Sequence, residues 1–118
     1  MVDVRRTMGN AAEDQAAAFL IGKRMTILAR QYRKRLGEID IVALDRGEVV
    51  FVEVKARKTR EFGYPEEAVT ARKLAKIAAV GEIFLREQNL LRSSYRIDVI
   101  AIDQSIDPVE IHYVIGVG

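Results

Sequence analysis

The sequence contains no cysteine, and His112 is its one histidine among 118 residues. The lack of cysteine excludes a disulfide scaffold, a thiolate metal site and a cysteine nucleophile. With one histidine, neither a Ser-His-Asp triad nor a multi-histidine zinc site is expected. No apolar run approaches the roughly 20 residues that span a bilayer, and no GxGxxG or P-loop pattern occurs. We therefore expect no membrane segment and no nucleotide cofactor.

Length and composition are typical of one folded domain. Hydrophobic residues make up 49% of the chain and charged residues 31%, which is enough apolar material for one core. The first residues lack the apolar stretch of a signal peptide. We therefore expect a single cytoplasmic domain over residues 1–118, with flexible ends at 1–8 and 116–118.

Positive charge is gathered in clusters, although the net charge is only +2. The three clusters are Arg30, Arg33, Lys34 and Arg35, then Lys55, Arg57, Lys58 and Arg60, then Arg72, Lys73 and Lys76. Basic clusters in a nearly neutral chain favour a surface that faces a polyanion such as nucleic acid. Ordinary solvated faces explain the same clusters when charge alone is considered.

The spacing of apolar residues predicts two long helices and five strands. The helices are predicted over 10–23 and 70–88, and the strands over 25–32, 37–45, 49–55, 95–103 and 110–115. Three consecutive strands favour an antiparallel meander, and the following helix allows a parallel crossover to the fourth strand. We therefore expect an α/β fold in which helices flank a mixed five-stranded sheet, in the order αβββαββ.

The second and third predicted strands form the most informative hairpin. A two-residue turn at Arg46-Gly47 places Asp40 opposite Glu53 and Glu38 opposite Lys55. One face is then apolar and carries Ile39, Ile41, Ala43, Val50, Val52 and Val54. The other face carries Val42, Leu44, Val49 and Phe51 near the turn, and Glu38, Asp40, Glu53 and Lys55 at its open end. A shift by one residue would bury charges, whereas an even shift keeps the same faces and stays open.

Two opposed carboxylates in such a hairpin need a compensating charge. Cβ atoms of directly opposed residues are about 4.5–5.5 Å apart, so Asp40 and Glu53 repel unless one holds a proton or a cation lies between them. Oxygen ligands with open water positions suit Mg²⁺ or Mn²⁺. Lys55 could then position a water or stabilise charge that develops on a phosphate. A polar patch in which Lys55 pairs with either acid explains the hairpin alone equally well.

Glu13 is a candidate third carboxylate. It shares a helix face with Ala16, Ala17 and Leu20, and an acid on a packed face is costly unless it is paired or linked to a metal. The alternative is a first-turn acid near the helix dipole that stays partly solvated.

Asp40 followed by Glu53-x-Lys55, on two strands after an N-terminal helix, resembles the PD-(D/E)xK nuclease superfamily. The chain is more specifically similar to the bacterial YraN family, also called UPF0102, which resembles archaeal Holliday junction resolvases. The resemblance covers about residues 9 to 103 and is carried by the segments 9–13, 27–30, 37–43, 51–57, 62–69 and 96–101. Two departures are Ala12 in place of a common glycine, and Gln31 in place of an asparagine before Tyr32-Arg33.

The resemblance implies a restriction-endonuclease-like α/β/α fold and a metal-dependent active site. Asp40 and Glu53 would bind Mg²⁺ or Mn²⁺, Glu13 would assist them, and Lys55 would be catalytic. Glu38 matches the family's Gly-Glu-Ile-Asp segment and is an accessory candidate.

The function implied is a structure-selective endonuclease that acts on branched or flapped DNA in repair or recombination. The alternative is a nucleic-acid-binding module of the same fold with little or no cleavage of its own. Five basic residues could contact phosphates: Arg57, Arg60, Arg72, Lys73 and Lys76. The expected partner is nucleic acid, DNA before RNA, and a homodimer is left open.

Overall fold

The computed structural model describes residues 11–59 and 69–117, which form two helices and five strands. In chain order these are α2 (Ala11–Gly22), β1 (Thr26–Lys34), β2 (Gly37–Asp45), β3 (Glu48–Arg57), α3 (Ala71–Glu87), β4 (Tyr95–Asp103) and β5 (Glu110–Val114). The predicted order αβββαββ is confirmed, and the predicted bounds differ by no more than two residues. No helix in the described part of the chain is long and apolar enough to cross a membrane.

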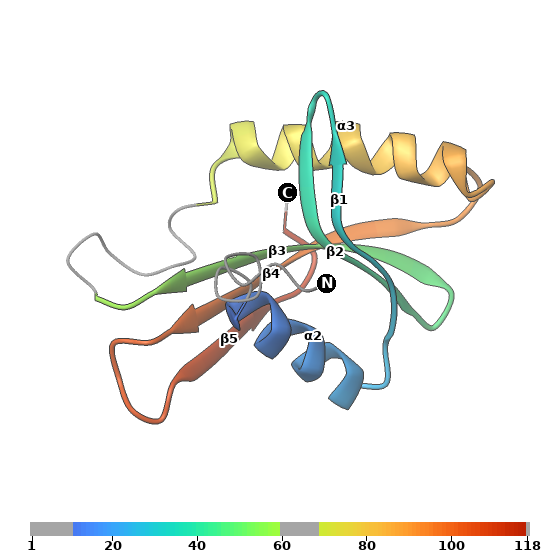
Figure 1. Ribbon diagram of the computed structural model, residues 1–118. Coiled ribbons are helices and arrows are strands. Elements are labelled where there is room, and N and C mark those ends of the chain that lie inside the picture. The colour runs from blue at the N-terminus through green and yellow to red at the C-terminus, as the bar shows by residue number, and fades with distance from the viewer. Residues whose placement is uncertain (1–10, 60–68, 118) are drawn as a thin grey trace, which may run out of the picture.

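The five strands form one open sheet in the order β1-β2-β3-β4-β5 (Figure 1). Neighbouring strands are antiparallel except β3 and β4, which run parallel. Helix α3 lies in the crossover between these two strands, and α2 and α3 cover opposite faces of the sheet. The mixed-sheet α/β fold that the sequence predicts is therefore confirmed.

The β2–β3 hairpin has the register that a two-residue turn predicts. Arg46 and Gly47 have φ angles of 51° and 86°, and a type I′ turn requires positive φ at both central positions. Backbone pairing runs without a shift from the turn as far as Ile41↔Val52. The even shifts that the sequence leaves open do not occur in this stretch.

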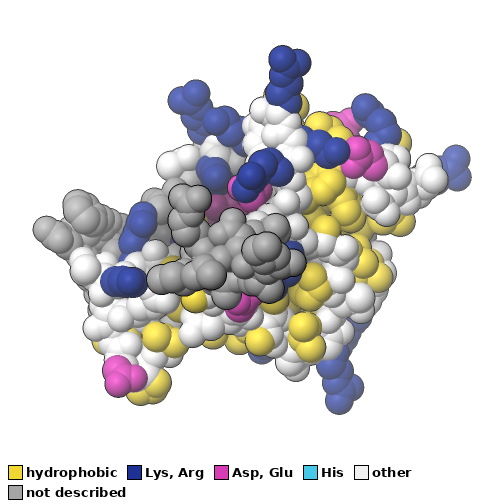
Figure 2. All heavy atoms as spheres, viewed as in Figure 1, with side chains coloured by type: hydrophobic (Ala, Val, Ile, Leu, Met, Phe, Trp, Pro, Cys, Tyr) yellow, Lys and Arg dark blue, Asp and Glu magenta, His cyan; other side chains and the backbone are white. Residues whose placement is uncertain are grey.

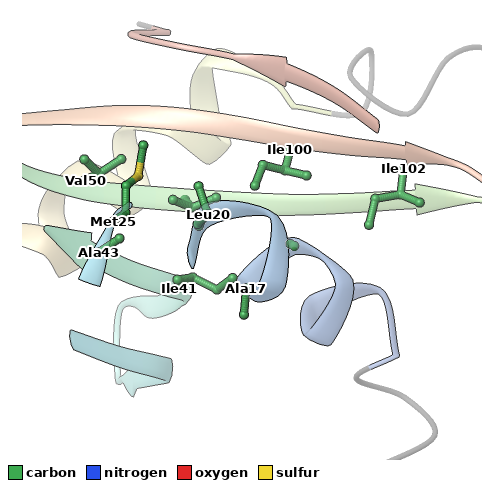
Figure 3. Close-up of a cluster of buried hydrophobic side chains, with 10 residues drawn as sticks. Ala17, Leu20, Met25, Ile41, Ala43, Val50, Ile100 and Ile102 are labelled. Atoms are coloured by element: carbon green, nitrogen blue, oxygen red, sulfur yellow. The ribbon is translucent and has the colours of Figure 1, made fainter. Parts of the chain in front are cut away.

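Each face of the sheet buries its own apolar core. The core under α2 includes the residues labelled in Figure 3, which are Ala17, Leu20, Met25, Ile41, Ala43, Val50, Ile100 and Ile102. The core under α3 contains Ile39, Val42, Val49, Phe51, Ile77, Val80, Phe84, Leu85 and Ile97. Because both faces are covered, the central strands are apolar on both sides over most of their length.

Ile39 lies in the core under α3, and the prediction that it shares a face with Ile41 is wrong. Residues two apart in a regular strand share a face, so the alternation of β2 is reset at Asp40. Strand β1 is irregular at the same level, because Gln31, which faces Asp40 across the two strands, has a φ of 50°. A simple period of two cannot predict this local change of face.

Gly81 is required where α3 packs on β3. A Cβ atom at this position would lie 2.5 Å from Cε2 of Phe51, and the Phe51 side chain is fully buried. We therefore expect Gly81→Ala to destabilise the protein by about 1–3 kcal/mol through overpacking. Urea unfolding measures this loss. Gly22→Ala is the matched control, because a Cβ there meets nothing within 4 Å, and equal stability of the two variants would contradict the packing argument.

Buried Asp98 ties the end of the chain to β4. Its Oδ1 accepts hydrogen bonds from Arg96 Nε at 3.1 Å and from Gly116 N at 2.9 Å, and its Oδ2 accepts one from the Tyr113 hydroxyl at 2.5 Å. Val117 N also donates to a backbone carbonyl of β4, at 2.8 Å. Residues 116 and 117, at the end that the sequence predicts to be flexible, are thus both hydrogen-bonded to β4.

Arg96 links this buried carboxylate to the β2–β3 turn. Its Nη1 lies 2.9 Å from Glu48 Oε1 and its Nη2 lies 2.9 Å from Asp45 Oδ2. One guanidinium therefore connects three acids from three strands, and the Arg96 side chain is only 18% exposed.

Candidate functional site

Asp40 lies where strands β2 and β3 separate. In an uninterrupted ladder Val54 would lie opposite Ile39, but the Val54 N–H donates to Asp40 Oδ2 at 2.8 Å. Each of the two strands remains paired with its other neighbour. Strand β2 pairs with β1 as far as Gly37, and β3 pairs with β4 as far as Arg57. The Asp40 carboxylate thus occupies the position of a lost ladder bond at the open end of the hairpin.

Glu53 is the buried acid of the site. It is 3% exposed, and its Oε1 lies 3.5 Å from Lys55 Nζ and 3.8 Å from Lys73 Nζ. Lys55 comes from the same strand, whereas Lys73 comes from the first turn of α3. A buried carboxylate needs compensating charge, and two lysines supply it here.

The electrostatics of Asp40 reflect this crowding of acids. Burial of the carboxyl, and then the negative charge of Glu53, raise the pKa of Asp40 to about 7. The hydrogen bond from Val54 N opposes the rise, while the charges of Glu13 and Glu38 add to it. Near neutral pH, Asp40 therefore binds a proton or a cation more readily than an ordinary aspartate.

Glu13 lies on the buried face of α2, as the sequence predicts, and it is 8% exposed. Its Oε1 accepts a hydrogen bond from Arg30 Nε at 2.8 Å, and Arg30 Nη2 also lies 2.5 Å from Asp14 Oδ1. Glu13 is thus buried and paired with an arginine of β1, and it is not the partly solvated first-turn acid of the alternative.

A cleft of about 300 Å³ opens beside Asp40. Its lining consists of Ala12, Glu13, Gln31, Arg33, Glu38, Asp40, Val54 and Ala56. Glu38 at its rim lies 3.3 Å from Arg33 Nη2. The candidate residues therefore meet around the end of the hairpin from two sides, since Asp40 borders a cleft shared with α2 whereas Glu53 contacts a lysine of α3. The prediction that Asp40 lies opposite Glu53 on one face is wrong, because the pairing of β2 with β3 ends at Ile41↔Val52 and the alternation of β2 is reset at Asp40.

The donor set fits a divalent cation that is held by two carboxylates. Mg²⁺ commonly binds through one or two carboxylates, keeps several waters and gains further oxygens from substrate phosphates. Asp40 and Glu53 match this mode, because the charge of Glu53 raises the pKa of Asp40 and a cation would relieve that repulsion. Within the described ranges, no group of three or more Asp, Glu, His or Cys is arranged to hold a metal ion. The assisting role of Glu13 at the metal stays a prediction.

Asp40→Asn should stabilise the metal-free protein by about 1–3 kcal/mol at pH 8. The pKa of Asp40 in the folded protein, about 7, lies above the ordinary value of 3.8, so ionised Asp40 opposes folding. The gain should be absent below about pH 4, grow up to about pH 7 and be complete above it. Urea unfolding in a chelator, repeated across this pH range, measures the gain.

Mn²⁺ provides the second half of that experiment. Excess Mn²⁺ should stabilise the wild type, because a ligand that binds only the folded state raises the free energy of unfolding. The Asp40→Asn variant should gain much less. An equal gain in both proteins would place the metal elsewhere.

The residues predicted to contact phosphates differ in their exposure and in their partners. Arg57 ends β3 and is half-buried, whereas Arg72 and Lys76 are exposed on α3. Lys73 points its ammonium group at Glu53. Arg60 lies outside the described residues. Figure 2 shows several Lys and Arg side chains spread over the upper part of one face, with acidic groups between them.

The first basic cluster is largely engaged in ion pairs. Arg30 binds two acids of α2, Arg33 contacts Glu38, and Lys34 Nζ lies 2.9 Å from Glu87 Oε2. Three of the four residues in this cluster therefore have acidic partners within the protein. Sequence reasoning missed these partners. Arg33 and Glu38 are five residues apart, but the other pairs, and the contact between Lys73 and Glu53, join residues that lie far apart along the chain.

Comparisons with known proteins agree on one family. Residues 12–102 match the model of the uncharacterised protein family UPF0102. The chain is 39% identical over 102 residues to a UPF0102 protein of Caldicellulosiruptor saccharolyticus, with 86% of each chain covered. It is 44% identical to one of Desulforapulum autotrophicum, covering 86% of this chain and 84% of the relative. It is 40% identical to one of Syntrophotalea carbinolica, covering 95% and 91%.

Proposed function

The chain belongs to the uncharacterised protein family UPF0102, and since that family has no assigned activity, we propose a function from the site itself. The protein is a divalent-metal-dependent endonuclease that cuts branched or flapped DNA during repair or recombination. The observation that carries this proposal is the pair of acids at the open end of the hairpin. The charge of buried Glu53 raises the pKa of Asp40, and Lys55 Nζ lies 3.5 Å from Glu53 Oε1. The resemblance of Asp40 and Glu53-x-Lys55 to the PD-(D/E)xK nucleases supports the same chemistry.

The residues have distinct tasks in phosphodiester hydrolysis. Asp40 and Glu53 would hold Mg²⁺ or Mn²⁺, which would supply Lewis-acid activation of the attacking water and of the phosphate. The Lys55 ammonium stabilises negative charge as the bond from the water oxygen to phosphorus forms and the bond to the leaving oxygen breaks. Because Lys55 also lies against Glu53, its position is fixed before the substrate binds.

Nucleic acid would approach along the exposed basic residues of α3 and of the segment that follows β3. Lys58 follows β3, and Arg72 and Lys76 lie on α3. Their charges contact phosphates without reading sequence, which suits recognition of a DNA structure.

A cleavage panel tests the proposal directly. Duplex, single-stranded, flapped and four-way DNA, with matched RNA substrates, are incubated with Mg²⁺, with Mn²⁺ and with a chelator. We expect metal-dependent cutting of the flapped or four-way DNA, and its loss in Asp40→Asn and in Glu53→Gln. Cutting that persists in both variants would show contamination or another active site.

The second candidate function is a nucleic-acid-binding module without intrinsic cleavage. It is favoured by the Glu13–Arg30 ion pair, in which an arginine already balances the charge of the third candidate carboxylate. If the wild type binds branched DNA but cuts no substrate with either metal, this candidate replaces the first.

A further inference from the structure

Two lysines converge on one buried carboxylate, which is more positive charge than Glu53 needs. Lys55 Nζ and Lys73 Nζ lie 3.5 Å and 3.8 Å from the same atom, Glu53 Oε1. Glu53 is 3% exposed, so its charge is poorly screened by water and a nearby cation interacts with it strongly. One ammonium group would balance the charge of Glu53.

Lys73 is the more loosely held of the two. Its Nζ lies beyond hydrogen-bond distance of Glu53, and its side chain is 39% exposed compared with 28% for Lys55. Its backbone is fixed, because Lys73 N donates to the Thr70 hydroxyl at the cap of α3. The side chain can therefore leave Glu53 for the solvent without any change in the helix.

We propose that Lys73 is the resting counter-ion of Glu53 and exchanges its place with the divalent cation. When the cation binds Asp40 and Glu53, the Lys73 ammonium is displaced and becomes available to a phosphate of the bound nucleic acid. This inference rests on the proposed function, since it assigns a regulatory role at the same metal site. Lys73 is thus a positioning residue that acts through Glu53, whereas the adjacent Arg72 is an ordinary phosphate contact.

Metal affinity without nucleic acid is the first test. Mn²⁺ is titrated calorimetrically into the full chain and into Lys73→Ala, Lys73→Arg and Arg72→Ala. Removal of the competing charge should tighten Mn²⁺ binding about tenfold in Lys73→Ala. Lys73→Arg should bind Mn²⁺ like the wild type, because it keeps the charge. Arg72→Ala should also be unchanged, and a purely structural role of Lys73 would weaken binding instead.

The salt dependence of DNA binding is the second test. Affinity for a labelled four-way DNA junction is measured against salt concentration, with and without Mn²⁺, before any product is detectable. Each phosphate contact contributes roughly 0.9 to the slope of log affinity against log salt. Lys73→Ala should lower this slope only when Mn²⁺ is present, whereas Arg72→Ala should lower it in both conditions.

The outcomes separate this inference from the proposed function. If the wild type binds Mn²⁺ but Lys73→Ala binds it no more tightly, the exchange is wrong while the metal site stands. If the exchange is observed but no DNA or RNA is cut, the endonuclease proposal fails and the inference stands. If the wild type binds no Mn²⁺ with or without the DNA junction, both are overturned.

Discussion

Lys55→Ala is expected to slow cleavage of the best DNA substrate about 10²–10³-fold while its affinity for that DNA changes little. Lys55 is anchored at Glu53 and lies next to the proposed metal position. Its charge matters most when negative charge builds on the phosphate, so its loss acts on the transition state more than on the ground state. Single-turnover cleavage and equilibrium binding, measured on the same substrate, separate the two effects.

Lys58→Ala is the matched control for that measurement. Lys58 is an exposed lysine three residues further along the same segment, so its loss should weaken binding slightly and leave the cleavage rate of bound DNA unchanged. If Lys55→Ala cuts as fast as the wild type, the active site has been placed wrongly even though the protein is a nuclease.

Asp98→Ala is expected to lower the free energy of unfolding by about 3–5 kcal/mol. Asp98 is completely buried, and its removal leaves Arg96, the Tyr113 hydroxyl and Gly116 N without their shared acceptor. Because domains of this size are stable by only about 5–15 kcal/mol, the variant should be close to unfolding at 37 °C. Urea or thermal unfolding measures the loss.

Glu110→Ala serves as the control for Asp98→Ala. Glu110 pairs with His112 on β5, but its side chain is 55% exposed, and exposed ion pairs contribute about 0–1 kcal/mol. If both variants lose less than about 1 kcal/mol of the free energy of unfolding, Arg96 finds other partners and the buried network around Asp98 contributes little to stability.

The order of the elements and the hairpin register could be predicted because both depend on local patterns. The positions of Arg46 and Gly47 between two apolar runs fix a two-residue turn, and the turn fixes every pair up to Ile41↔Val52. The same reasoning brought Asp40, Glu53 and Lys55 to one end of the hairpin.

The errors arose where one strand departs from its regular period. Ile39 changes face because the chain is irregular at Gln31 and Asp40. Neither residue type predicts such an irregularity in a strand. Ion pairs between elements that are distant along the chain could not be predicted from the sequence either. Arg30 belongs to a basic run in the sequence, but α2 crosses β1 so that this arginine meets Glu13, and the crossing depends on the packing of the whole core.

The separation of β2 from β3 leaves the two acids on strands that do not pair with each other at their level. Glu53 is carried by a strand that stays bonded to β4, whereas Asp40 belongs to the β1–β2 hairpin, whose pairing with β3 ends at Ile41↔Val52. The hydrogen bond from Val54 N to Asp40 Oδ2 joins the two strands across this gap. The protection of the Val54 amide proton against hydrogen exchange should therefore report the free energy of breaking this bond. A cation held between the two acids would therefore meet strands that are not paired with each other at this level, so cations of different ionic radius would require no broken ladder bonds between β2 and β3.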